Sequence, residues 1–506
     1  MWSRCAQVVL PWLFVTVIVG CGETAPRARR EAWDIYFMQG TKIGYGHVAQ
    51  TPDNRNGLPA TKTVAETSLA MQRFGQQTAM RIDCTSWESL DGRLLEFECT
   101  TRLGPSPQTT RGGVVGDTLR IETQPAAGQP ARPPTVLPIT KPLGGFNAID
   151  DSLARQPMQP GQRRTIESIW PVINRPATTV LVARDVETTD LLRGTAKLLR
   201  IEASTQLPGS PPIDSVLWAD ERGEVLKNRI ESLDQTAYRT SREVAIGHDV
   251  NRAAGGAAGF DLGWSSLVKV SPPIPDAHAT RRVRYAVELA GGNPTEAFVS
   301  DAGQHVERSG PHSAEITVVA VRPDTPIDAM AVAADPPIAA DRQPSALVQS
   351  DDPRVVAMAK EAAGDEKDPW ALAQRLEAFV HGKIRAKNFS QAFASAAEVA
   401  ATLEGDCSEH AVLLAALARA RGLPARVALG LVYVEAESAF GFHMWTETYV
   451  VDRWIAMDAT LGRGGIGAAH LKLGTTRLAD GDALASFLRV AQVLGRLKIR
   501  VLDVER

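Results

Sequence analysis

The pattern of hydrophobic and polar positions divides the chain into a β-rich first part and a more helical later part. From about residue 31 to 325, apolar and polar residues alternate in short runs such as 33–37 and 282–287, which is typical of strands with one buried face. Helical signals begin at Asp352-Pro353 and Asp368-Pro369, where an N-cap residue precedes a proline at the first helical position. We therefore predict a multidomain chain, with mainly antiparallel β structure in the N-terminal two thirds and an α+β domain near the C-terminus.

Changes in this pattern predict the boundaries of six segments. They are a leader at 1–21, a β-rich region at 31–250, a small β region at 266–325, a linker at 326–350, an α+β domain at 351–475 and a C-terminal extension at 476–506. The β-rich region can be read as two related units, which is one of two interpretations. The Gly/Ala-rich stretch 253–259 and the prolines near 323–337 separate neighbouring segments.

Trp87 and Trp218 begin two similar short stretches. In each, a glycine follows five residues after the tryptophan and an apolar pair comes next. This faint repeat indicates either two related β units or two hairpins in one long curved sheet. Any strand with a tryptophan before a turn would also look alike, so the repeat alone does not choose between these interpretations.

Cys84 and Cys99 flank a predicted hairpin at Asp91-Gly92. If these two residues form a two-residue turn, Cys84 and Cys99 lie opposite each other on one face of the sheet. Counting outward from the turn places them at a hydrogen-bonded pair, with α-carbons about 5.5 Å apart. Both a disulfide and two buried reduced thiols fit this placement.

The first residues are typical of an export signal. Arg4 precedes an apolar stretch at 6–19, which is too short to span a bilayer. The stretch ends at Ile18-Val19-Gly20-Cys21, which resembles a bacterial lipobox, so Cys21 is a candidate lipidation site. We expect an exported, membrane-anchored lipoprotein facing the periplasm or the cell exterior, with an ordinary secretory signal as the alternative.

Composition narrows the choice of partners. The chain of 506 residues is 44% hydrophobic and 22% charged, which is ordinary for a soluble globular protein, and its net charge of -3 gives no case for nucleic acid binding. The histidines of the β part lack the spacing of metal ligands, and no calcium-loop pattern is visible. We therefore assign neither a metal nor another cofactor.

Cys407 is the candidate nucleophile of the later part. It follows Gly405-Asp406 at the start of a predicted Ala/Leu-rich helix, which Asp406 can cap together with Glu409. A helix N-terminus and a nearby imidazole both favour the thiolate, which is the reactive form of a cysteine. His443 and Asp458 follow on predicted strands, so the three residues have the types required for a thiol triad.

Four blocks around these residues resemble the transglutaminase-like superfamily. In order along the chain they are Gly405-Asp406-Cys407, the Gly-Leu-Pro-Ala-Arg stretch 422–426, the His-Met-Trp-Thr-Glu stretch 443–447 and the stretch 454–460 that contains Asp458. The resemblance covers about residues 350–475. It implies a papain-like α+β core with Cys407 as nucleophile, His443 as base and Asp458 as the acid that orients the base. The expected supporting residues are Asp406, Glu409, His410, Trp445 and Glu447.

The mechanism implied by the resemblance is acyl transfer from a protein or peptide carboxamide through a cysteine thioester. An amine acceptor would give a crosslink, whereas water would make the protein a cysteine protease or amidase. The balance depends on the exclusion of water, for which Trp445, Trp454, Phe440 and Phe442 are candidates. A non-catalytic envelope protein that keeps the fold for binding is the third hypothesis. A zinc site of Cys407, His410, His443 and Asp458 has suitable ligand types, but the resemblance gives three of these residues other roles.

The distance between His443 and Asp458 poses a geometric problem. If Asp452-Arg453 formed a tight turn, Asp458 would lie four residues, or about 13 Å, along the strand from His443. A longer connection, a bulge or another strand pairing is required to bring the two side chains together, and we expect one of these.

Overall fold

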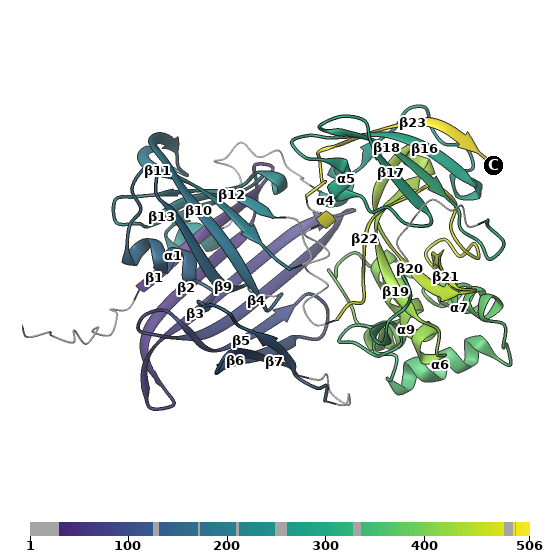
Figure 1. The fold of residues 1–506 in the computed structure, drawn as a ribbon, viewed down its shortest axis with the longest axis horizontal. Coiled ribbons are helices and arrows are strands. Elements are labelled where there is room, and N and C mark those ends of the chain that lie inside the picture. The colour runs from purple at the N-terminus through teal and green to yellow at the C-terminus, as the bar shows by residue number, and fades with distance from the viewer. Residues whose placement is uncertain are drawn as a thin grey trace, which may run out of the picture.

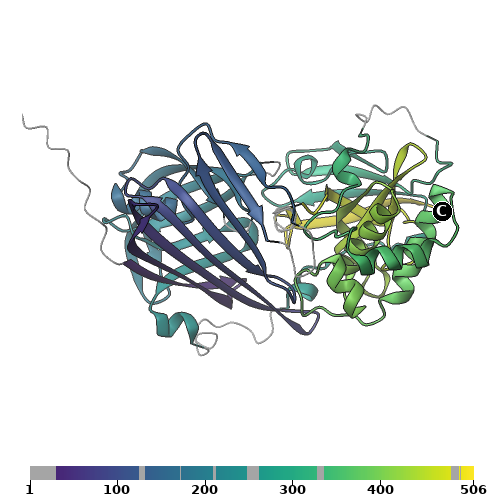
Figure 2. The ribbon, with the colours of Figure 1, turned by 90° about the horizontal axis from the view of Figure 1, so that it is seen from below.

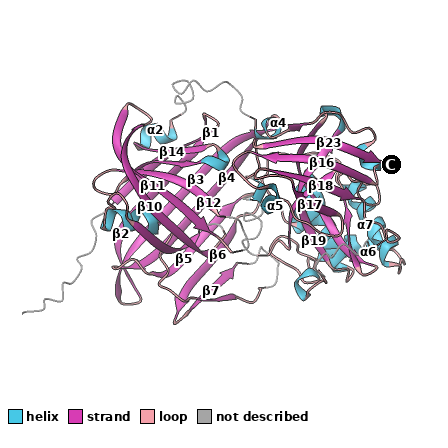
Figure 3. Ribbon diagram, turned by 45° about the horizontal axis from the view of Figure 1, so that its top comes forward, coloured by secondary structure: helices cyan, strands magenta, loops and turns pink. Residues whose placement is uncertain are grey.

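The computed structural model describes residues 30–124, 131–170, 173–208, 212–247, 261–326, 335–479, 489–490 and 492–506. The predicted leader with Cys21 and the Gly/Ala-rich stretch lie outside the described residues. The described residues form a β part and an α+β part that lie side by side (Figures 1 and 2). This confirms the predicted fold class, since strands dominate the first part and the longer helices gather in the second (Figure 3).

One antiparallel sheet of 14 strands makes up the β part. Its order is β8-β7-β6-β5-β4-β3-β2-β1-β14-β13-β12-β11-β10-β9, so two meanders meet where β1 pairs with β14. The strands are β1 (Arg30–Met38), β2 (Thr41–Arg55), β3 (Leu58–Arg73), β4 (Gln76–Ser89), β5 (Leu94–Arg102), β6 (Gln108–Val115), β7 (Thr118–Thr123), β8 (Thr135–Pro138), β9 (Arg163–Trp170), β10 (Arg175–Asp190), β11 (Thr195–Gln206), β12 (Ile213–Ala219), β13 (Val225–Ile230) and β14 (Gln235–Thr240). Helices α1 (Ala148–Arg155) and α2 (Arg242–Ile246) accompany the sheet.

The two tryptophan stretches form hairpins with the same irregularity. The register shifts directly after Trp87 in the β4–β5 hairpin and directly after Trp218 in the β12–β13 hairpin. Each turn has a glycine with positive φ at the same position, Gly92 at 91° and Gly223 at 76°. The two stretches are thus similar hairpins that lie in one sheet of 14 strands.

The β4–β5 turn differs from the predicted two-residue turn. The Ser89 amide donates to the Arg93 carbonyl, so three residues connect the strands and a bulge follows. Beyond the bulge the register places Cys84 opposite Cys99, and the two form a buried disulfide. Their α-carbons are 4.0 Å apart, nearer to the spacing of a non-hydrogen-bonded pair than to the expected one, because a bulge changes the alternation of the ladder.

A five-stranded sheet and four helices form the core of the α+β part. The strands are β15 (Val268–Lys269), β19 (Ala425–Val434), β20 (Ala439–Val450), β21 (Arg453–Met457) and β22 (His470–Thr476). The helices are α6 (Pro353–Ala363), α7 (Pro369–Lys383), α8 (Ala396–Thr402) and α9 (Cys407–Ala420). Asp352 and Asp368 cap α6 and α7 as predicted, and Ser395 begins a capping box at α8.

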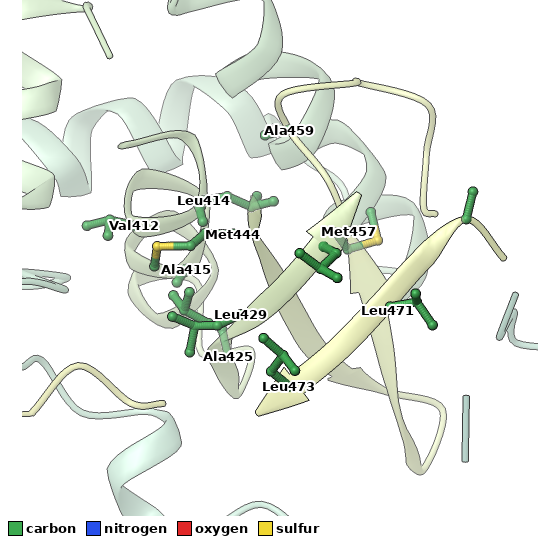
Figure 4. Packing of buried hydrophobic residues seen from close by; sticks show 14 of the residues in the cluster. Val412, Leu414, Ala415, Ala425, Leu429, Met444, Met457, Ala459, Leu471 and Leu473 are labelled. Atoms are coloured by element: carbon green, nitrogen blue, oxygen red, sulfur yellow. The ribbon is translucent and has the colours of Figure 1, made fainter. Parts of the chain in front are cut away.

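Helix α9 lies in the middle of this core. Its residues from Ser408 to Arg419 are buried, which explains the composition of Ala and Leu. Figure 4 shows Val412, Leu414 and Ala415 of α9 in one cluster with Leu429 of β19 and Met444 of β20. The helix that begins at Cys407 is therefore fixed by packing along its length.

A four-stranded sheet completes the α+β part, in the order β17-β18-β16-β23. Its strands are β16 (Arg282–Leu289), β17 (Gln304–Arg308), β18 (Ser313–Val319) and β23 (Leu497–Glu505), with the short helices α4 (Leu262–Ser265) and α5 (Pro294–Ala297) nearby in the chain. The segments predicted as a small β region and as a C-terminal extension thus share one sheet. Within the described ranges, no helix is both long and apolar enough to cross a membrane.

Candidate active site

Cys407 is the first residue of α9, and a capping box holds the helix start. The Asp406 carboxylate accepts a hydrogen bond from the Ser408 amide at 2.8 Å, and the Glu409 carboxylate accepts one from the Asp406 amide at 2.9 Å. The Cys407 side chain is half-buried and unpaired. The helix dipole favours negative charge at this position, which suits a thiolate.

His443 and Asp458 meet beside this helix start. The ring of His443, on β20, donates from Nε2 to Oδ2 of Asp458 at 2.7 Å, and the charge of Cys407 acts on the same ring. Both His443 and Asp458 are buried. The structure therefore brings the three predicted residues together in the order thiol, imidazole, carboxylate.

The charges of the three groups stabilise one another. Burial alone would lower the pKa of His443, but the charges of Asp458 and Cys407 outweigh it and raise the pKa to about 10. Burial would raise the pKa of Asp458, but hydrogen bonds and charge from His443 hold it well below its ordinary value. An imidazolium hydrogen-bonded to the Asp458 carboxylate is thus the favoured state of this pair.

The β20–β21 turn explains how Asp458 reaches His443. Val451 and Asp452 form the turn, both with positive φ, so Val450 pairs with Arg453. The turn thus lies one position before Asp452-Arg453, and the pairing differs by two residues from the one that a turn at Asp452-Arg453 would give. Asp458 follows the last residue of β21 and lies closer to His443 than that hypothetical turn would allow, so the expected alternative pairing exists.

Glu377 of α7 holds the backbone of Asp458, a role that the sequence analysis missed. Its Oε1 accepts from the Asp458 amide at 2.9 Å, and its Oε2 accepts from the Gly465 amide at 3.1 Å. Burial raises the pKa of Glu377 to about 7, against opposing backbone hydrogen bonds. The sequence did contain a signal for this role. Glu377 lies on the same helix face as the buried residues Ala373 and Val380, and a buried carboxylate needs hydrogen-bond partners.

His470, at the start of β22, is the second missed residue. Its Nε2 lies 3.1 Å from Oδ2 of Asp458, so one carboxylate oxygen accepts from two imidazoles. These three side chains are also of metal-binding types, with ligand atoms within 4.8 Å of one another. Both imidazoles are already engaged with the carboxylate, and hydrogen bonding accounts for the arrangement. The residues near His470 in the sequence do not predict its role, because the pairing of β22 with β19 brings it to the site.

The remaining predicted supporting residues divide into two groups. His410 is bound to the helix start, with Nδ1 2.6 Å from the Asp406 carbonyl oxygen, and Trp445 stacks beside His443 with ring centroids 6.3 Å apart. Glu447, in contrast, pairs with Arg426 at 2.8 Å and with Lys472 rather than with the triad. The Glu447 side chain stabilises a buried ion-pair network of the sheet.

Of the aromatic residues proposed to exclude water, Trp445 stacks beside His443. Phe440 packs against Tyr285 and Tyr433, while the Trp454 ring lies under Arg426 and donates to the Asp335 carbonyl. Phe442, like Cys407, is partly buried against the core of the α+β part.

Residues 356–459 match the family described as "Transglutaminase-like superfamily". Residues 356–459 form a transglutaminase-like domain. The range begins within α6 and ends one residue after Asp458, so it contains Cys407, His443 and Asp458. Members of this superfamily are typically cysteine-based enzymes, which agrees with the geometry of the site.

Comparisons with other proteins give weaker likenesses. No curated protein matches the chain. Among solved structures, a candidate cysteine protease from Cytophaga hutchinsonii is 16% identical (45% of this chain, 85% of that chain, TM-score 0.28). The periplasmic domain of TgpA from Pseudomonas aeruginosa, bound to ethylmercury, is 17% identical (38% and 78%, TM-score 0.24). A β-barrel-like protein of the DUF1849 domain from Brucella abortus is 11% identical (42% and 94%, TM-score 0.30).

Proposed function

We propose that the transglutaminase-like domain transfers an acyl group from a protein or peptide carboxamide to an amine through a thioester at Cys407. The observation that carries the proposal is the chain of contacts from the thiol at the start of a buried helix, through His443, to Asp458. This is the arrangement that makes a cysteine nucleophilic and supplies a proton to a leaving group.

The reaction proceeds in two steps, formation of the thioester and its attack by an amine. The Cys407 thiolate attacks the carboxamide carbon, and the Cys407 backbone amide, which the capping box does not use, is the donor at the helix start that can stabilise the oxyanion. The His443 imidazolium protonates the nitrogen, the C–N bond breaks, and ammonia leaves. An amine then attacks the thioester, gives its proton to His443 and releases the thiolate, so a new amide forms and the enzyme is restored.

Hydrolysis is the second candidate, and two observations favour it. Cys407 is half-buried rather than enclosed, and Phe440 and Trp454 contact other parts of the domain. Water that reaches the thioester would release a carboxylic acid in place of a crosslink.

The proposed place of action is the cell envelope, with a lipid on Cys21 as the membrane anchor. The lipobox-like sequence at 18–21 supports this, and the Cys84–Cys99 disulfide is of the kind that persists in an oxidising compartment. A free thiol at Cys407 in the same chain fits a reactive role.

The test uses the mature chain after residue 21, a glutamine-bearing protein and a labelled primary amine, with Cys407→Ala as the matched control. Amine incorporation and ammonia release are followed in parallel. Incorporation that requires Cys407 supports acyl transfer, and ammonia or new peptide ends without incorporation support hydrolysis. Equal product with the wild type and with Cys407→Ala would refute both.

A further inference from the structure

The β3–β4 hairpin of the large sheet extends to the α+β part, where its tip contacts the segment before α8. The Phe389 amide donates to the Gln76 side chain at 2.8 Å, and the Thr78 hydroxyl donates to the Phe389 carbonyl at 2.6 Å. The rings of Phe74 and Phe389 lie 5.0 Å apart between centroids. The hairpin tip is thus docked by polar and aromatic contacts together.

A second contact fixes the same segment to the sheet. The Leu103 carbonyl, which follows β5, accepts from the Ala392 amide at 2.8 Å and from the Phe393 amide at 3.1 Å. A side chain at Gly104 would collide with the Phe393 carbonyl oxygen, at 2.2 Å from an added Cβ. The two backbones therefore approach as closely as a glycine permits, which indicates a defined interface between the two parts.

The side chain of Arg73, the last residue of β3, extends from this interface to Asp406 at the start of α9. Its Nη1 lies 2.7 Å from Oδ2 of Asp406, while Oδ1 of the same carboxylate caps the helix. The Asp406 side chain is 2% exposed and the Arg73 side chain 22% exposed. Burial opposes the charge of Arg73, but the charges of Asp406, Cys407 and Glu409 raise its pKa. A guanidinium is therefore held beside the residue that precedes the nucleophile.

We propose that Arg73 is a positioning residue of the active site, which the β3–β4 hairpin brings to Asp406 in order to favour the anionic form of Cys407. The inference rests on the proposed thiol chemistry and adds a role for the β part, which becomes a structural component of the catalytic site. Its physical basis is that Asp406 places a buried carboxylate one residue from the thiol. Without the cation of Arg73, this carboxylate would oppose formation of the thiolate and would stand as an uncompensated buried charge.

Other groups also act on the charge of Cys407. Arg73 of β3 and His443 of β20 interact with Cys407 directly. The titratable groups that face these residues are Asp406, Glu409 and His410 at the start of α9, His381 of α7, Asp458 after β21 and His470 of β22. Burial and the charge of Asp406 raise the pKa of Glu409 to about 8, so Glu409 is mainly protonated at neutral pH. Arg73 is consequently the cation that balances Asp406 at the helix start.

The test measures the rate of alkylation of Cys407 by iodoacetamide across pH, with intact mass as the readout. Arg73→Gln removes the cation, Arg73→Lys restores a charge, and Arg81→Gln is the control, because Arg81 lies on the same hairpin with a half-exposed side chain paired to Glu66 and Asp83. We expect Arg73→Gln to slow alkylation about tenfold at neutral pH and to move the acidic limb up by about one pH unit. Arg73→Lys should recover most of the rate, and Arg81→Gln should match the wild type.

An unchanged acidic limb in Arg73→Gln, or an equal shift in Arg81→Gln, would overturn the inference. If Arg73→Gln does not fold, Phe74→Ala weakens the docking without removing a charge and should give a shift in the same direction; an unshifted limb there would overturn the inference as well. The outcome is distinct from failure of the proposed function, in which wild-type Cys407 would react no faster than free cysteine and His443→Ala would not slow it.

Discussion

Replacement of Asp458 by asparagine tests the electrostatic core of the site. The carboxylate accepts from both His443 and His470, and an asparagine has nearly the same shape but no charge. Its oxygen can still accept one of the two N–H groups. The change therefore removes the anion that stabilises the His443 imidazolium with little loss of volume.

The magnitude follows from the pKa of His443. The shift from 6.5 to about 10 corresponds to roughly 5 kcal/mol at about 1.4 kcal/mol per pKa unit. Asp458 shares this stabilisation with Cys407, so we assign about half of it, roughly 2 to 3 kcal/mol, to the carboxylate. Asp458→Asn should lower kcat/KM by about 100-fold and move the alkaline limb of the pH–rate profile down by about two units, because the imidazolium then loses its proton at lower pH.

The assay is ammonia release as a function of pH, for the wild type, Asp458→Asn and the control Asp341→Asn. Asp341 is also fully buried and ion-paired, to Arg477 at 2.7 Å, but it is not among the groups that act on the triad. The control should lose stability and keep the pH profile of the wild type. An alkaline limb that stays in place in Asp458→Asn would refute the assignment of Asp458 as the stabiliser of the imidazolium.

Three further predictions concern other parts of the structure. The double change Cys84→Ser and Cys99→Ser opens a link between residues 15 apart and should lower the free energy of unfolding by about 3 kcal/mol in urea titrations; an unchanged midpoint would contradict this. The pKa of Glu377 is raised by burial from 4.5 to about 7, so its stabilisation is fully present below pH 4.5 and is lost as pH rises through 7; Glu377→Gln should flatten that decline in thermal unfolding, and an identical slope would count against it. His470→Gln should lower kcat about fivefold with little change in KM, through loss of one hydrogen bond to Asp458, and a change confined to KM would argue against this role.

Local sequence signals were sufficient for the helix that carries the nucleophile. Asp406 and Glu409 form the predicted capping box, and Gly422, with φ of 81°, directly follows the C-cap residue Arg421. These features depend on residues within one or two turns of each other, so the sequence contains the whole interaction. The positions of Cys407, His443 and Asp458 were predictable because several blocks with fixed spacing agreed.

The remaining features depend on contacts between distant segments. His470 reaches Asp458 through the pairing of β22 with β19, and Arg73 reaches Asp406 through the docking of a hairpin more than 300 residues earlier in the chain. The sequence left the register of β20 and β21 open, because the turn uses Val451 and Asp452 with positive φ, which is uncommon for a valine. Tertiary packing determines these contacts and this register, so local sequence patterns do not predict them.

The central claim is that Cys407 forms a thioester with the acyl group of a carboxamide. The direct measurement is the intact mass of the mature chain, quenched in acid during reaction with a glutamine-bearing peptide, followed by mapping of the modified residue. We predict a mass increase equal to the peptide less ammonia, located on Cys407, removed by hydroxylamine and absent in Cys407→Ala. Product formation without an adduct on Cys407, or at an equal rate in Cys407→Ala, would contradict the account.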